Sequence, residues 1–260
     1  MIDAPKFAYV TVLWSPSQND PTSIIADAIV LGESLRRCKS KHDKILLATS
    51  DLMQHASASA LRKFWEIREI EHLVVGDVHL SCDPRFSNVL TKLQVLTLIE
   101  YQKIVLLDSD IVVRRNVDEL FDIPAPAGMM RGPLDHKPDW VRDPKTYRKG
   151  GINGGVVVLK PDFNEFMQLS KILRGKAATS PKWFRVLKQS KGPEQDLLSH
   201  WYGASKGQLR GLHPKYNYQL HQLLFHPDID NDRMRPIRYL LTMAFRLVHS
   251  LLLNLFALLS

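Results

Sequence analysis

The feature that most limits the fold is an alternation of short apolar runs with segments of helical periodicity. The apolar runs have strand length, and in the segments between them apolar residues recur at spacings of three and four. Strands and helices that alternate in this way form βαβ units, which predicts an α/β fold with a mostly parallel sheet flanked by helices. The expected strands are 7–14, 44–50, 70–78, 103–107 and a glycine-led strand within 150–160, and the expected helices are 24–38, 57–67, 87–101, 162–173 and 193–203.

The charge balance leaves the class of partner open. The chain of 260 residues carries a formal net charge of +8, and its basic residues are densest between positions 131 and 191. Such an excess is typical of a solvated basic surface, and it also suits nucleic acid, anionic lipid or a phosphorylated substrate. Because the sequence has no zinc-finger spacing, no aromatic RNA-binding pattern and no basic zipper, we expect no nucleic-acid partner.

Cysteine content and the first residues bear on the compartment. Cys38 and Cys82 are too few and too unpatterned to form a disulfide framework in a chain of this length. No signal peptide or membrane anchor is recognisable before Phe7. We therefore expect a cytoplasmic or cytosol-facing protein, with a truncated N-terminus as the open alternative.

Two carboxylates interrupt the most strand-like segment, KIVLLDSDIVV at 103–113. An apolar run, Ile104 to Leu107, leads directly into Asp108 and Asp110. Carboxylates are costly to bury without partners, but ligands of parallel sheets bind beyond the carboxyl ends of strands. In an extended segment the two side chains would face the same way, and their oxygens suit Mn²⁺ or Mg²⁺ bridging to a phosphate. A solvated surface turn is the alternative.

The order of motifs around these aspartates resembles the family 8 glycosyltransferases of the GT-A fold, which include glycogenins, galactinol synthases and lipopolysaccharide galactosyltransferases. The similarity covers residues 7–225. Its strongest block joins TKL at 91–93 to YQKIVLLDSDIVVRRNVDELF at 101–121. INGGVVVLKP, from position 152, resembles the family's N-[ASG]-G motif, and EQDLL, from position 194, resembles its [DE]-Q-[DG]-x-L motif. The resemblance implies a single nucleotide-sugar-binding domain over residues 1–235.

The resemblance also implies a donor site. Asp108 and Asp110 match the family's metal ligands, and Ser109 would lie near the ribose. Lys92 matches a lysine that contacts the diphosphate or the sugar. The opening strand would hold uracil and ribose at Thr11 and Val12.

A second group of residues is implied to lie around the sugar. Asn153, Gly154 and Gly155 match the loop lining the sugar site, where missing side chains let backbone approach a ligand. Glu194 and Gln195 match the pair beside the anomeric carbon, and Asp196 would lie on the acceptor side. Each element also has a structural interpretation: Lys92 as a surface lysine, the Asn-Gly-Gly segment as a tight turn, and Gln195 as a helix cap.

The implied activity is metal-dependent transfer of a hexosyl group from a UDP-sugar to a hydroxyl acceptor, with retention of configuration. Gln195 is a poor nucleophile, which favours front-face transfer in which the leaving diphosphate takes the acceptor's proton. Glu194 and Asp196 remain open as attacking carboxylates. The acceptor is open among a polyol, a glycan, a glycolipid and a protein side chain.

The C-terminal part departs from the family pattern. The family has a third metal ligand, a histidine, where Arg238 stands in this sequence, and no KPW motif follows. Three interpretations stay open: the two aspartates and substrate phosphates suffice for the metal, Arg238 itself contacts the diphosphate, or the chain is a catalytically impaired nucleotide-sugar-binding homologue. A basic membrane- or nucleic-acid-binding protein is the alternative from another class.

The last segment, residues 236–260, is apolar enough to suggest a spanning helix, yet its polar residues share one helical face. We expect an amphipathic helix that packs on the domain, on a second copy in a homodimer, or on a membrane surface. A spanning anchor is the remaining alternative.

Overall fold

The computed structural model describes residues 6–15, 20–73, 88–131, 151–174 and 192–217. The chain divides into two units, Met1–Asn217 and Tyr218–Ser260. The fold below is that of the first unit. Arg238 and the predicted C-terminal helix at 236–260 lie outside the described residues, so their roles and the domain boundary at 235 stay predictions.

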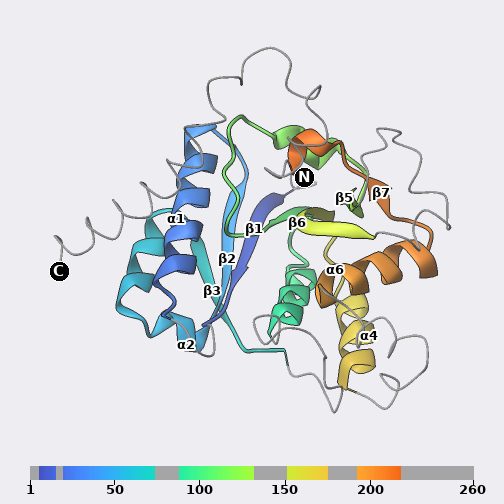
Figure 1. Ribbon diagram of the computed structural model, residues 1–260, viewed down its shortest axis with the longest axis horizontal. Helices are drawn as coiled ribbons and strands as arrows, with labels where there is room; N and C mark the ends of the chain where they lie inside the picture. Colours follow the sequence, from blue (N-terminus) through green and yellow to red (C-terminus); the bar gives the residue numbers. More distant parts are fainter. Residues whose placement is uncertain (1–5, 16–19, 74–87, 132–150, 175–191, 218–260) are drawn as a thin grey trace, which may run out of the picture. The chain divides into compact units, whose positions relative to one another are not determined.

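Within these residues seven strands form one sheet, in the order β3-β2-β1-β4-β6-β5-β7 (Figure 1). The four strands β3, β2, β1 and β4 are parallel to one another, whereas β6 is antiparallel to both of its neighbours. The expectation of a mostly parallel α/β sheet is confirmed. The strands are β1 (Phe7–Leu13), β2 (Asp43–Thr49), β3 (Glu66–Ile70), β4 (Lys103–Leu107), β5 (Ala127–Met130), β6 (Ile152–Leu159) and β7 (Arg210–Gly211).

Helices cover both faces of the sheet, with α1 and α2 on one side and α4 and α6 on the other (Figure 1). Because successive side chains of a strand point to opposite faces, Val10 and Val12 pack with Leu93 on one side, while Tyr9 packs with Leu31 on the other. The helices are α1 (Thr22–Arg37), α2 (Ser50–Met53), η1 (Ala56–Lys63), η3 (Val89–Thr97), η4 (Asp118–Asp122), α4 (Phe163–Arg174), α6 (Pro193–Leu198), η7 (Ser199–Ser205) and η8 (Pro214–Tyr216).

The direction of β6 positions the candidate site. Because β6 is antiparallel to β4, its first residues lie beside the last residues of β4, with Leu107 opposite Val156. The register continues one step further, where the backbone N–H of Asp108 donates to the carbonyl of Gly155 at 2.9 Å. The two motifs, 45 residues apart in the sequence, therefore meet at one edge of the sheet.

Three predicted elements differ from the structure. The strand expected at 70–78 does not match at its start: the strand is β3, Glu66–Ile70, and residues 71–73 are not in a strand, while residues 74–78 lie outside the described residues. Its sequence, EIREI, is rich in charge because β3 is an edge strand, where charged side chains protect the unpaired edge. The helix expected at 87–101 is the 3₁₀ helix η3, and the helix expected at 57–67 is the 3₁₀ helix η1, which ends before β3 begins.

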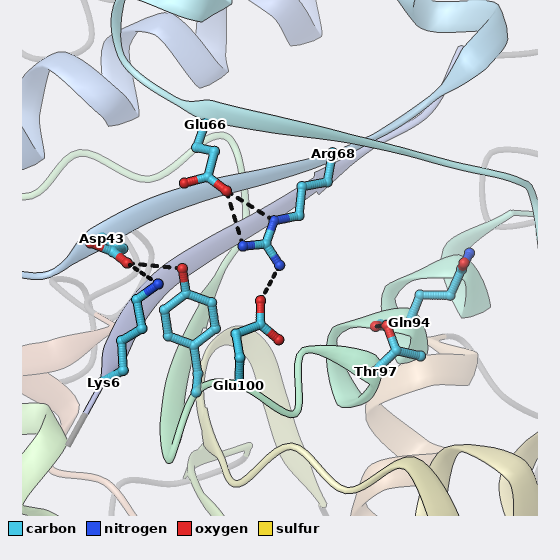
Figure 2. Close-up of polar contacts among 8 residues, drawn as sticks. Lys6, Asp43, Glu66, Arg68, Gln94, Thr97 and Glu100 are labelled. Carbon is cyan, nitrogen blue, oxygen red and sulfur yellow. Dashed lines mark hydrogen bonds and ion pairs between the residues drawn. The ribbon is translucent and has the colours of Figure 1, made fainter. Parts of the chain in front are cut away.

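At the opposite end of the sheet, where the parallel strands begin, polar side chains form a network (Figure 2). The Tyr101 hydroxyl donates to Asp43 at 2.9 Å, and the Lys6 ammonium lies 3.4 Å from the same carboxylate. Arg68 pairs with both Glu66 and Glu100. These polar and charged groups pair with one another. The candidate site lies at the other end of the sheet, the carboxyl edge, where the parallel strands end.

The described part of the chain contains no helix with the length and apolar content needed to cross a bilayer.

Candidate active site

The carboxyl end of β4 presents Asp108 and Asp110. The strand ends at Leu107, and residues 109 and 110 form a turn in which the N–H of Ile111 reaches the carbonyl of Asp108 at 3.3 Å. The segment is thus not extended, so the strand argument for a shared direction of the two side chains does not apply. The carboxylates nevertheless interact: partial desolvation and then the negative charge of Asp108 raise the pKa of Asp110.

Lys92 on η3 faces the first of these carboxylates. Its Nζ lies 2.5 Å from Oδ1 of Asp108 and 3.6 Å from Oε1 of Glu194, and its side chain is only 11% exposed. Burial by itself lowers the pKa of Lys92, but Asp108, Glu194 and Asp110 together raise it above its ordinary value. Lys92 is therefore a charged, buried group and not the surface lysine of the structural interpretation.

Glu194 lies in the first turn of α6, which begins at Pro193, a residue suited to the first helical position. The Glu194 side chain is 7% exposed. Burial raises its pKa, Lys92 opposes that shift, and Asp108 adds to it. A Cβ placed on Gly154 would come within 2.4 Å of Glu194 Oε1. Glu194 thus occupies the space that any side chain at position 154 would need.

The Asn-Gly-Gly segment lies inside β6, so the tight-turn interpretation is wrong. Asn153 is fixed by its own surroundings: its Oδ1 accepts from the N–H of Gly155 at 2.8 Å and from Nδ2 of Asn217 at 2.7 Å. The Gly154 N–H donates to Oε1 of Gln195 at 2.9 Å. Gln195 therefore joins α6 to β6 through its side chain; the structure records no side-chain cap at the start of α6.

Two residues at the carboxyl edge could not be assigned to the site from the sequence. Asn217 holds Asn153 from 64 positions away and belongs to no motif. Arg131 follows β5, and its guanidinium pairs with Asp196 in the first turn of α6. The strand order, in which β5 lies beside β6, is what brings Arg131 to the site, and the sequence does not give that order.

Thr11 and Val12 lie at opposite faces near the end of β1. Val12 packs in the same apolar cluster as Leu93, the neighbour of Lys92 in η3. Thr11 is fully buried, and its hydroxyl has no hydrogen-bond partner within the described part of the chain. Strand alternation points the Thr11 side chain to the face of Tyr9 and Leu13. Their predicted contact with uracil and ribose stays a prediction.

The carboxylates of Asp108 and Asp110 suit a hard divalent cation whose remaining ligands come from the substrate. Nowhere in the described ranges do three or more histidine, cysteine, aspartate or glutamate side chains form a ready metal cluster. Two carboxylates in a partly exposed turn, where burial and then the charge of Asp108 raise the pKa of Asp110, suit Mg²⁺ or Mn²⁺ completed by substrate phosphates. Asp108 would share its carboxylate between such an ion and Lys92.

Comparisons with known proteins agree with this architecture. No family model matches the chain. It is 31% identical over 202 residues to the uncharacterized protein R707 of Acanthamoeba polyphaga mimivirus, covering 76% of this chain and 67% of that one. It is 34% identical over 142 residues to human glycogenin-2, covering 53% of this chain but only 25% of that protein. Galactinol synthase 1 of Solanum lycopersicum is 25% identical over 254 residues, covering 92% and 73% of the two chains.

Among solved structures, the glycosyltransferase GlyE of Streptococcus pneumoniae superposes with a TM-score of 0.53 at 16% identity, covering 90% of this chain and 53% of that one. The galactosyltransferase LgtC, solved with donor and acceptor sugar analogues, gives a TM-score of 0.51 at 15% identity, covering 87% and 81%. At these identities the likeness establishes the fold.

Proposed function

Because the chain belongs to the family 8-like glycosyltransferases of the GT-A fold, which include hexosyltransferases, we propose that it transfers a hexosyl group from a UDP-sugar to a hydroxyl acceptor. One observation carries the proposal. At the carboxyl edge of the sheet Lys92 pairs with Asp108 and Glu194, and next to Glu194 the Gln195 side chain is hydrogen-bonded to Gly154. A cation, a metal-binding carboxylate and close-approach backbone are what binding a sugar diphosphate requires.

In this proposal Asp108 and Asp110 would hold Mn²⁺ or Mg²⁺. The ion, when bound, supplies positive charge to the departing diphosphate. Lys92 supplies a second positive charge from the protein side, fixed by its contacts with Asp108 and Glu194. The space beside the α-carbons of Gly154 and Gly155 is filled by Glu194 and by the Asn153–Asn217 pair, so in this proposal the two glycines let these side chains pack against β6 at the edge of the sugar site.

We favour front-face transfer with retention. The bond between the anomeric carbon and the phosphate oxygen breaks, the bond to the acceptor oxygen forms on the same face, and the acceptor's proton passes to the diphosphate. The surroundings of the two carboxylates support this choice over attack by a protein group. Glu194 is buried between Lys92 and Gly154, and Asp196 is paired with Arg131.

We infer a UDP-hexose donor and a hydroxyl acceptor as classes from membership of the family. The names of the relatives include a glycogenin, a galactinol synthase and an inositol phosphorylceramide glucuronosyltransferase, of which this chain spans 25%, 73% and 28% of the length. The proposed donors are accordingly UDP-glucose, UDP-galactose and UDP-glucuronate. The proposed acceptors are a polyol, a glycan, a glycolipid or a protein side chain.

A panel of these three UDP-sugars tests the proposal. With Mn²⁺, the protein is expected to release UDP from one of them, and an excess of EDTA is expected to lower the rate at least about a hundredfold, because charge stabilisation of the leaving group is lost. Unfolding midpoints with and without UDP, measured in the same buffers, provide the binding control. A Mn²⁺-dependent shift with UDP but no release from any sugar would favour the impaired homologue. No shift and no release would contradict the site.

A further inference from the structure

Arg131 stands at the far side of the site from the metal-binding aspartates. Along the carboxyl edge the strand order is β4, β6, β5, so Asp108 follows β4, Asn153 and Gly154 open β6, and Arg131 follows β5. If the sugar lies over the start of β6, as proposed, Arg131 lies beyond it, on the side away from Asp108 and Asp110.

Two contacts hold Arg131 in this place. Its backbone N–H donates to the carbonyl of Gly151 at 2.9 Å, and its guanidinium pairs with Asp196 on α6. A Cβ on Gly151 would come within 2.8 Å of the guanidinium and within 2.7 Å of the Ser199 hydroxyl. Gly151, at φ +61°, thus makes room for Arg131 and for the helix that continues α6.

Asp196 is adjacent in sequence to the two residues that face β6. One turn of helix carries Glu194, Gln195 and Asp196, and the same helical run continues to Ser199. Gln195 accepts from the Gly154 N–H, and the Ser199 hydroxyl accepts from the Ile152 N–H at 2.8 Å. Two backbone donors of β6 therefore depend on α6 staying where the Arg131–Asp196 pair holds it.

We propose that Arg131 is a positioning residue of the transfer reaction, which fixes the first turn of α6, and with it Glu194 and Gln195, against the start of β6. This rests on the proposed function. No sequence motif includes Arg131. Its role is inferred from its ion pair with Asp196 and from the two β6 amides that donate hydrogen bonds to Gln195 of α6 and Ser199 of η7. Lys92 pairs with Asp108 and Glu194, whereas Arg131 pairs with Asp196, so loss of the Arg131–Asp196 pair is expected to change donor binding less than turnover.

The test compares Arg131→Met, Arg131→Lys and the wild type in amide hydrogen exchange and in UDP-sugar hydrolysis. Arg131→Met is expected to speed exchange of the Ile152 and Gly154 amides at least about tenfold while leaving β1 amides unchanged. It is expected to lower kcat at least about tenfold with KM for the UDP-sugar within about twofold, as small misplacements of reacting groups do. Arg131→Lys keeps the charge and is expected to recover part of both losses.

Arg36→Met is the matched control, because it removes an arginine–carboxylate pair, with Glu33, on the exposed face of α1. If Arg131→Met changes exchange and kcat no more than this control does, the proposal is overturned. Faster exchange with unchanged kcat overturns it equally, since Arg131 would then matter only for stability. Should Arg131→Met fail to fold, Asp196→Asn breaks the same pair and must speed exchange of the same two amides.

Exchange is measured without turnover, which separates this inference from the proposed function. A wild type that hydrolyses no UDP-sugar would count against the function, while unchanged exchange at Ile152 and Gly154 in the pair-breaking variants would count against Arg131.

Discussion

Asp110→Asn is expected to lower metal-dependent UDP-sugar turnover at least about a hundredfold and to leave the unfolding midpoint at or slightly above the wild-type value. Turnover falls because one of two metal-binding carboxylates becomes a neutral amide, and charge stabilisation of this kind accounts for about two to three orders of magnitude in rate. Stability does not fall, because burial and then the negative charge of Asp108 raise the pKa of Asp110, so the folded state disfavours the ionised carboxylate at this position.

Asp108→Asn is the matched variant with a different expected signature. It should lose turnover to a similar extent, and it should also lower the free energy of unfolding by about 2 kcal/mol. Lys92 loses the carboxylate at 2.5 Å while its ammonium stays buried, and uncompensated buried charge is costly. The cost is moderate because Glu194 remains 3.6 Å away and the Asp108 side chain is 33% exposed.

Chemical denaturation and UDP release, measured on both variants, check this pair of expectations. Equal stability losses in the two variants would show that the Lys92–Asp108 contact does not stabilise the fold. Full turnover in both would refute their role as metal ligands.

Gly154→Ala is expected to reduce turnover at least about a hundredfold and to destabilise the fold by about 1–3 kcal/mol, the usual range for overpacking. The added methyl would come within 2.4 Å of Glu194 Oε1, and that carboxylate is buried against Lys92. Either Glu194 or the start of β6 must move, and both belong to the proposed sugar site. The measurements are the steady-state rate of UDP release and the denaturation midpoint.

Gly207→Ala is the control for stability. Gly207 has φ +63°, so alanine is strained there by about 1 kcal/mol, but no atom lies within 4 Å of the added methyl. Its turnover is expected to stay within about twofold of wild type. If Gly154→Ala and Gly207→Ala lose stability equally and both keep turnover, the close approach at Gly154 has no functional meaning.

The sequence predicted the part of the site that depends on local chemistry. The apolar run before Asp108 indicated a strand end, and the ends of parallel strands are where ligands bind, so the DxD placement followed from the residues themselves. The strand at 103–107 has the predicted bounds, and the α/β class followed from the alternation of elements.

The remaining parts depend on tertiary packing. The direction of β6 relative to β4 places Asn153 and Gly154 beside Asp108, and no local pattern specifies which way a buried strand runs. Arg131 reaches the site because β5 lies next to β6. Asn217 reaches it because the residue after η8 lies beside Asn153 at the start of β6. The burial of Lys92 also could not be predicted from the helical pattern, because a lysine among the apolar residues of an amphipathic helix is usually exposed to solvent.

The most direct test of the central claim is calorimetric titration of UDP into the wild type in Mn²⁺, into the wild type in EDTA, and into Asp110→Asn in Mn²⁺. Binding is expected in the first case and affinity at least about tenfold weaker in the other two, because the diphosphate would be held through a cation on Asp108 and Asp110. Equal affinity in all three, or no binding of UDP by the wild type in Mn²⁺, would contradict the assignment of this edge of the sheet as the nucleotide-sugar site.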